Sequence, residues 1–134
     1  MLNGDVKDLV MEPVVLTAVT NEMPIAKNEI FGPVAPIIKA RDVDHAIQIA
    51  NDSLNGLSGS IFTEDRHLGS EVAKKIETGM IHVNDQSVND ESHIPFGGEK
   101  ESGIGRFNGE WAIEKFTTVK WIGIQNGYRD FPIF

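Results

Sequence analysis

Apolar residues along this chain recur in two periods, one typical of β-strands and one typical of α-helices. Short β-prone runs bounded by Pro, Gly or Asn predict strands over residues 13–19, 34–40, 57–63 and 80–84. Pro13 marks the first run as an edge strand, and Pro36 would interrupt the hydrogen-bonded ladder of the second. Residues 1–12 are polar and mixed, and no element is predicted there.

Two helices are predicted between these strands. The first follows Asp42, a candidate N-cap, and its apolar face is formed by residues at i, i+3, i+4 and i+7, which are Val43, Ala46, Ile47 and Ala50. The turn Asn55-Gly56 is expected to end it. The second helix follows Asp65, ends at Gly79, and carries the apolar stripe Leu68, Val72, Ala73 and Ile76.

The order strand, helix, strand, helix, strand predicts βαβαβ units. Connections of ten or more residues imply parallel pairing with right-handed crossovers, so the predicted fold class is α/β with a partial parallel sheet covered by helices. A chain of 134 residues fits a single domain over 1–134.

The segment 85–110 shows no periodicity. It holds five glycines, which predict a long ordered loop of the kind that carries function: Gly97, Gly98, Gly103, Gly105 and Gly109. A short helix is predicted over 110–115, and the β-prone run 116–124 predicts a terminal strand.

Composition narrows the function classes. The chain has 12 Lys plus Arg against 20 Asp plus Glu, a formal charge of −8, which disfavours nucleic acid and anionic membranes as partners. The longest apolar runs fall far short of a membrane span, and Met1–Asp5 has no basic start followed by an apolar stretch, so we expect a cytoplasmic protein. The absence of Cys excludes disulfides, thiolate metal sites and a cysteine nucleophile within these residues.

The sequence does not match the familiar motifs for phosphate binding, metal binding or catalysis. The glycine segment lacks the Lys and Ser/Thr of a P-loop, and Asn108 stands where a dinucleotide fingerprint needs its third Gly. The four histidines are dispersed without metal-ligand spacing, so no metal site is predicted. Carboxylate pairs such as Asp90-Glu91 lie in polar surroundings, and no serine stands in a nucleophile elbow. These residues alone predict an α/β domain without a visible catalytic set.

Two segments change this interpretation. Residues 29–34 (EIFGPV) and 95–106 (PFGGEKESGIGR) resemble two marker motifs from the C-terminal part of NAD(P)-dependent aldehyde dehydrogenases, in the same order and with a βαβ pattern between them. The resemblance covers residues from about 11 to about 124, and it implies a segment of the catalytic domain over about 11–115 followed by a terminal strand over about 116–124. The stretch 84–91 is similar to the branch acting on benzaldehyde, vanillin or salicylaldehyde.

The resemblance also implies roles for three residues. Glu29 would accept hydrogen bonds from the hydroxyls of the nicotinamide ribose, and Phe31 would lie beside the nicotinamide. The alternative is that Glu29 is a solvated charge in a loop and that Phe31 is an aromatic ring packed in the core. Phe96 would line the aldehyde tunnel, with simple packing as an equal alternative. Lys100, Ser102 and Arg106 are expected to fix the loop rather than to touch substrate.

The family's reaction needs a cysteine thiolate to attack the aldehyde, and this chain has no Cys. We therefore expect a fragment of an aldehyde dehydrogenase with no catalytic residue of its own, inactive alone and without tight binding of NAD or NADP. A homo-oligomer or a complementing aldehyde dehydrogenase subunit is the expected partner.

Two other functions remain open. The chain could be a non-catalytic assembly module, because the family's last strand joins the sheet of a neighbouring subunit and residues 116–124 have the β propensity to do so. It could also be an independent binding protein for an aromatic aldehyde that uses the loop around Phe96.

Overall fold

Two pairs of parallel strands form the centre of the fold. The structure is a computed structural model that describes residues 6–132, so the first five and last two residues of the domain expected over 1–134 lie outside it. Strand β3 (Val14–Leu16) pairs with β4 (Val34–Pro36), and β6 (Ser58–Ile61) pairs with β7 (Met80–Val83). Both pairs are parallel, and the pairing of β6 with β7 across a helix was predicted. The predicted pairing of 34–40 with 57–63 is not formed, and β4 pairs instead with β3. No ladder joins the two pairs within the described residues, so the expected sheet is two separate two-stranded sheets.

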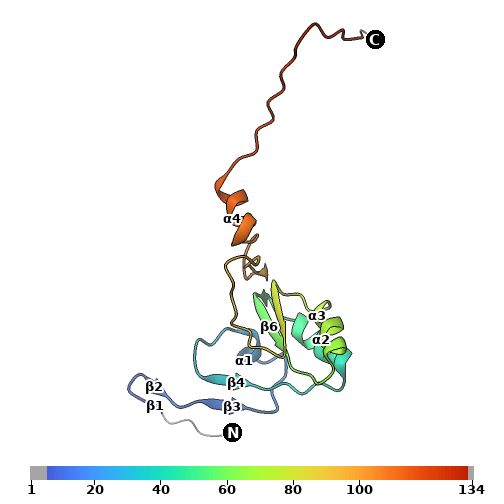
Figure 1. Ribbon diagram of the computed structural model, residues 1–134. Helices are drawn as coiled ribbons and strands as arrows, with labels where there is room; N and C mark the ends of the chain where they lie inside the picture. Colours follow the sequence, from blue (N-terminus) through green and yellow to red (C-terminus); the bar gives the residue numbers. More distant parts are fainter. Residues whose placement is uncertain (1–5, 133–134) are drawn as a thin grey trace.

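The two predicted helices are both present. Helix α3 connects β6 to β7, and helix α2 precedes β5 and β6 in the chain. Helix α2 (Val43–Asn51) begins at Asp42, whose Oδ1 accepts a hydrogen bond of 2.8 Å from the His45 amide. Helix α3 (Arg66–Ala73) begins at Asp65, whose Oδ1 accepts from two amides of the first turn at 2.9 and 3.1 Å. Both predicted caps are confirmed. The two helices lie together beside β6 (Figure 1).

Helix α3 packs directly on the sheet. Its Gly69 is buried against β7, where an added Cβ would lie 2.7 Å from Cγ1 of Val83. Only a glycine permits this close approach of the helix to the strand.

Several short elements were not predicted from the pattern. Strands β1 (Val6–Lys7) and β2 (Val10–Met11) form an antiparallel hairpin, and α1 (Pro24–Lys27) is a single helical turn. Strand β5 (Asn55–Gly56) pairs antiparallel with β8 (Glu99–Lys100). The Asn55-Gly56 turn therefore lies beyond the end of α2 rather than terminating it, and the glycine-rich segment contains a short strand instead of being loop throughout.

The terminal strand expected over residues 116–124 is not formed in this chain taken by itself, and its pairing with a neighbouring subunit stays a prediction. Helix α4 (Gly109–Phe116) includes Phe116, and the described residues that follow have no assigned secondary structure. They extend away from the α/β body (Figure 1), with Val119 and Trp121 102% and 94% exposed. The physical reason is that β propensity forms a strand only where a second backbone is in reach, and none is in reach here.

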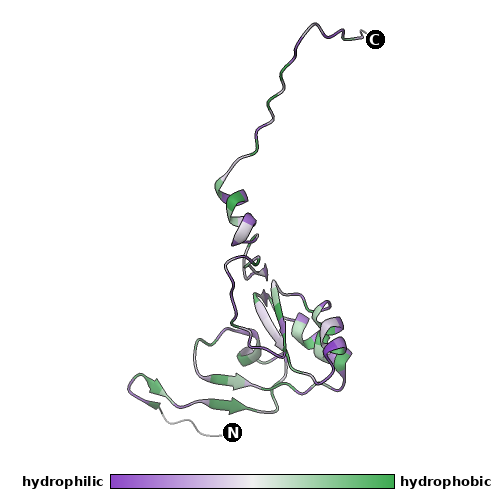
Figure 2. Cartoon of the chain, viewed as in Figure 1, coloured by the Kyte–Doolittle hydropathy of each residue, from purple (hydrophilic) through white to green (hydrophobic). Residues whose placement is uncertain are grey.

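Little apolar surface is buried. Among the described residues the buried hydrophobic side chains are Val14 and Val19. The predicted apolar face of α2 is only partly covered, because Ile47 is half-buried whereas Val43 is 43% exposed and Ala46 and Ala50 are exposed as well. Figure 2 shows hydrophobic positions on β3, β4 and the C-terminal segment. Of these, Val14 on β3 is buried, whereas Val119 and Trp121 in the C-terminal segment are exposed.

Within residues 6–132 no helix is both long enough and apolar enough to cross a membrane.

Candidate functional site

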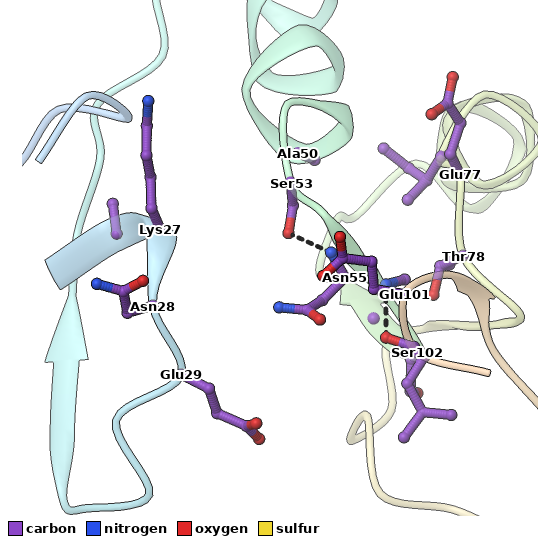
Figure 3. Close-up of a pocket in the computed structure, with 16 residues that line it drawn as sticks. Lys27, Asn28, Glu29, Ala50, Ser53, Asn55, Glu77, Thr78, Glu101 and Ser102 are labelled. Carbon is purple, nitrogen blue, oxygen red and sulfur yellow. Dashed lines mark hydrogen bonds between the residues drawn. The ribbon is translucent and has the colours of Figure 1, made fainter. Parts of the chain in front are cut away.

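Glu29 stands in the turn between α1 and β4 and faces an open cavity. The turn leaves α1 at Asn28, whose amide donates to the carbonyl of Pro24 at 3.0 Å. The cavity has a volume of about 660 Å³ and is bounded by this turn, the end of α2, strands β5 and β6, and residues 101–102 (Figure 3). The carboxylate of Glu29 is exposed and points from one wall toward this space (Figure 3).

Lys27 adds a positive charge to the same wall. A hydrogen bond of 3.0 Å to Oε2 of Glu22, together with the Coulombic attraction between the two groups, raises the pKa of Lys27. Lys27 and Glu29 thus both line the cavity on its α1 side, with the Lys27 ammonium paired to Glu22 and the Glu29 carboxylate exposed.

Phe31 has an unusual backbone. Its φ is +48°, in the left-handed region that a bulky side chain rarely adopts, and its side chain is 92% exposed. Such strain costs on the order of 1–3 kcal/mol and concentrates at functional sites. The alternative that Phe31 is a core ring is wrong for this chain, because the strained turn presents the ring outward.

Phe96 lies at the entry to the glycine-rich segment and is half-buried. Its backbone forms an antiparallel bridge with Phe107, with N–H to carbonyl distances of 3.0 and 2.7 Å. Of the three residues singled out in the sequence, Glu29 lines the cavity, whereas Phe31 and Phe96 are not among its lining residues.

Lys100 anchors the glycine-rich segment to the end of α2. Its Nζ donates to the carbonyls of Asn51 and Ser53 at 2.6 and 3.0 Å and forms an ion pair of 3.0 Å with Oε2 of Glu77. The Asn51 carbonyl is at the C-terminal end of α2 and has no intrahelical donor, and Ser53 lies just beyond that end, so a cation there is favourable.

Two further side chains of the motif hold the same segment. The Oγ of Ser102 accepts a hydrogen bond of 2.8 Å from the amide of Gly56. Arg106 donates to the carbonyl of Gly98 at 3.0 Å and pairs with Glu99. The contacts of Lys100, Ser102 and Arg106 agree with the expectation that these three residues fix the loop.

Two asparagines that hold the segment 85–107 in place were not singled out by sequence reasoning. Asn84 has a φ of +60°. Its side-chain amide makes the pair of bonds that a backbone peptide group would make: Oδ1 accepts from the amide of Thr63, and Nδ2 donates to the carbonyl of Thr63, both at 2.8 Å. Asn108 has a φ of +70°, and its Nδ2 donates to Oδ1 of Asp90 at 2.9 Å. They tie both ends of the segment 85–107, and the tolerance of Asn for the left-handed region was the available signal.

The described residues contain no group of three or more His, Asp or Glu arranged to hold a metal ion. The exposed carboxylate of Glu29 offers polar recognition in the cavity, and the exposed ring of Phe31, outside the cavity lining, offers an apolar contact surface.

Comparison with known proteins assigns this arrangement to a family. Residues 2–122 match the model of the aldehyde dehydrogenase family. The chain is 50% identical over 129 residues to benzaldehyde dehydrogenase YfmT of Bacillus subtilis, a match covering 96% of this chain and 27% of that protein. It is 48% identical over 124 residues to a vanillin dehydrogenase of Corynebacterium glutamicum, covering 92% of this chain and 26% of that protein.

Solved structures agree with these sequence matches. A salicylaldehyde dehydrogenase from Pseudomonas putida G7, in complex with salicylaldehyde, superposes with a TM-score of 0.92 at 36% identity, covering 98% of this chain and 28% of that one. An aldehyde dehydrogenase of Mycobacterium tuberculosis in complex with NAD+ superposes with a TM-score of 0.86 at 38% identity, covering 96% of this chain and 28% of that one. The chain spans about a quarter of the length of these relatives. By sequence and by fold, this chain belongs to the aldehyde dehydrogenase family.

Proposed function

We propose that this chain supplies one wall of the active site of an NAD(P)-dependent aldehyde dehydrogenase, as the C-terminal part of its catalytic domain. The observation that carries the proposal is the strained, 92% exposed Phe31 two residues after the cavity-lining Glu29, both within a family match over residues 2–122. The strained turn exposes the aromatic ring at an energetic cost, and contact of the ring with a ligand would account for that cost.

The residues fit the nicotinamide end of the cofactor. Glu29 has an accessible carboxylate that can accept hydrogen bonds from two ribose hydroxyls at once, and Phe31 offers an apolar ring surface to a planar heterocycle. When bound, NAD(P) supplies the acceptor for the hydride that leaves the substrate. Phe96 would contact the aldehyde at the other end of the site.

An aromatic aldehyde is the substrate class that the relatives support. The names of the two relatives described above refer to benzaldehyde and vanillin, and the structure from Pseudomonas putida contains salicylaldehyde. In the complete enzyme the product would be the corresponding carboxylic acid.

The nucleophile must come from other polypeptide, because these 134 residues contain no Cys. The test is complementation of Bacillus subtilis benzaldehyde dehydrogenase from which the matching 129 residues have been deleted. Benzaldehyde-dependent formation of NADH is expected from the mixture and from neither part alone. Aldehyde oxidation by this chain alone would contradict the proposal.

Glu29→Gln tests the cofactor role within that mixture. Loss of a charge-assisted hydrogen bond, worth about 1.5 kcal/mol or more, should raise the KM for NAD about tenfold or more with little change in the KM for benzaldehyde. Glu64→Gln, an exposed carboxylate before α3, is the matched control. An unchanged KM for NAD in Glu29→Gln would remove Glu29 from the cofactor site.

A second candidate is an assembly module, and a specific observation favours it. Residues 117–124 are extended, unpaired within the described chain and rich in exposed apolar side chains, which include Val119, Trp121, Ile122 and Ile124. Such a segment can add to the sheet edge of another subunit through main-chain bonds. Capture of full-length benzaldehyde dehydrogenase by the intact chain, and its loss when residues 117–134 are removed, would support this role.

A further inference from the structure

The dipeptide Asn-Gly occurs at residues 3–4, 55–56, 108–109 and 126–127. Such a pair contains its own electrophile and nucleophile, because the backbone nitrogen of the glycine can reach the side-chain carbonyl carbon of the asparagine and close a five-membered ring. Glycine has no Cβ to obstruct this approach and leaves the backbone free to adopt it. The structure describes the last three of these pairs, and it holds them in different ways.

The pair Asn55-Gly56 is held in strand β5. The Gly56 amide donates to Oγ of Ser102 at 2.8 Å, and β5 pairs with β8 through Gly56 and Glu99. Gly56 is buried, and a Cβ added there would lie 2.6 Å from the carbonyl oxygen of Glu77. The Gly56 nitrogen can therefore attack only after the contact between β5 and β8 opens.

The pair Asn108-Gly109 is held at the start of α4. The Gly109 amide donates to the carbonyl of Ser92 at 3.0 Å, so the attacking nitrogen already has a partner. Nδ2 of Asn108 donates to Oδ1 of Asp90 at 2.9 Å and to the carbonyl of Glu91 at 3.3 Å. Both reacting groups must leave these partners before a ring can close.

The pair Asn126-Gly127 lies in the extended residues that follow α4 (Figure 1), beyond the family match that ends at residue 122. Both residues are exposed, and outside the adjacent residues no atom lies within 4 Å of the position of a Cβ at Gly127. Within residues 6–132 neither the Asn126 side chain nor the Gly127 amide has a hydrogen-bond partner. These two groups can therefore reach the geometry of ring closure without breaking any contact.

We propose that Asn126 is a site of spontaneous deamidation, with water as the co-reactant. The Gly127 nitrogen forms a bond to Cγ of Asn126, and the bond between Cγ and Nδ2 breaks. The proton of the Gly127 amide leaves with Nδ2 as ammonia, and a succinimide ring remains. Water then opens the ring at either carbonyl, which gives aspartate or isoaspartate, and no atom is oxidised or reduced.

The product carries a charge that Asn126 lacks. Among residues 117–132 the charged side chains are Lys120, Arg129 and Asp130, so a carboxylate at position 126 cancels the net positive charge of this segment. Isoaspartate also adds one methylene to the main chain. Deamidation therefore changes the charge next to Ile124, the last residue of the apolar segment 117–124, and leaves the cavity beside Glu29 unchanged.

The experiment incubates the folded chain at mildly alkaline pH and follows the three described pairs by mass spectrometry. Trypsin cleaves after Lys and Arg and places each pair on a separate peptide, covering residues 42–66, 107–115 and 121–129. In the folded chain, Asn126 should deamidate about tenfold faster or more than Asn55 and Asn108, which react only from an opened state. In urea the rates should converge to within about threefold, because the contacts that protect the other two pairs are lost.

Equal rates in the folded chain would overturn the proposal. A tenfold difference that persists in urea would also overturn it, because the local sequence and not the structure would then select Asn126.

Two substitutions test the chemistry at this pair. Asn126→Gln lengthens the side chain, so that the same attack would have to close a less favoured six-membered ring. Gly127→Ala keeps Asn126 and places a Cβ beside the attacking nitrogen, and each variant should form the acidic product about tenfold more slowly or less than that. Gly123→Ala, in the same exposed segment but outside any Asn-Gly pair, is the matched control and should leave the rate unchanged.

Isoelectric focusing of the intact chain measures the acidic product, and circular dichroism checks that the variants keep their fold. Undiminished formation of the acidic product in Asn126→Gln or Gly127→Ala, or an equal decrease in Gly123→Ala, would overturn the assignment to Asn126.

Discussion

Lys100→Met should loosen the contact between the glycine-rich segment and the end of α2. The substitution keeps most of the aliphatic stem and removes the ammonium, which bonds to the carbonyls of Asn51 and Ser53 and to the carboxylate of Glu77. The Lys100 side chain is only 23% exposed, whereas that of Glu77 is 61% exposed. The two carbonyl contacts should therefore outweigh the ion pair.

The magnitude follows from these contacts. A hydrogen bond to a charged group is worth about 1.5–3 kcal/mol, and an exposed ion pair adds about 0–1 kcal/mol. Water can solvate the freed carbonyls in part, so the expected loss is about 2 kcal/mol, which corresponds to about a 30-fold change in a local opening equilibrium.

Native-state hydrogen exchange measures this opening directly. The reporters are the Gly56 amide, which bonds to Ser102 Oγ at 2.8 Å, and the Glu101 amide, which bonds to the carbonyl of Leu54 at 3.0 Å. Both should exchange about 30-fold faster in Lys100→Met. The Asn84 amide, bonded to Ile61 in the β6–β7 pair, is the internal control. Acceleration by less than about threefold at Gly56 and Glu101 would refute the role assigned to Lys100, since the loss would then be under about 0.7 kcal/mol.

Three further predictions concern local structure. Asp65→Ala removes the acceptor for two amides at the start of α3 and should destabilise that helix by about 1 kcal/mol, measured by exchange of its first-turn amides. Asn84→Ala loses both hydrogen bonds to Thr63 and places Ala at a φ of +60°, so it should destabilise β6–β7 by about 1 kcal/mol more than Asn84→Gly, measured by exchange of the β7 amides. The hydrogen bond from Lys74, followed by its Coulombic attraction, lowers the pKa of Glu71. This pair's contribution is therefore present above the unfolded-state pKa of Glu71 and is lost as the pH falls through the folded-state pKa, and Lys74→Met should raise the pKa of Glu71 in an NMR titration.

Local features of the fold were predictable from the pattern alone. Asp42 and Asp65 cap their helices with amides two or three residues away, so the sequence by itself contains both partners of each bond. The parallel β6–β7 pair was predictable for a similar reason, since the helix that joins its two strands lies in the same continuous stretch of sequence, whereas the β3–β4 pair was not predicted.

Features that depend on distant residues were not predictable. Lys100 and Asn51 are 49 positions apart, and nothing in either neighbourhood indicates that one reaches the other. The positive φ of Phe31 and the exposure of its ring could not be predicted from the hydrophobic pattern either, since an aromatic residue between apolar neighbours is as typical of a core as of a binding site.

The sequence by itself determined the helix starts, the parallel β6–β7 pair and the two motifs that mark the family, because each of these depends on residues close together along the chain. Only the tertiary structure decided which apolar faces are covered. It left most of the α2 stripe and the segment 117–124 open, although both carry patterns that are typical of a buried or paired element. The physical reason is that amphipathic periodicity and β propensity specify a surface able to pack, whereas burial and strand pairing also require a second surface within reach.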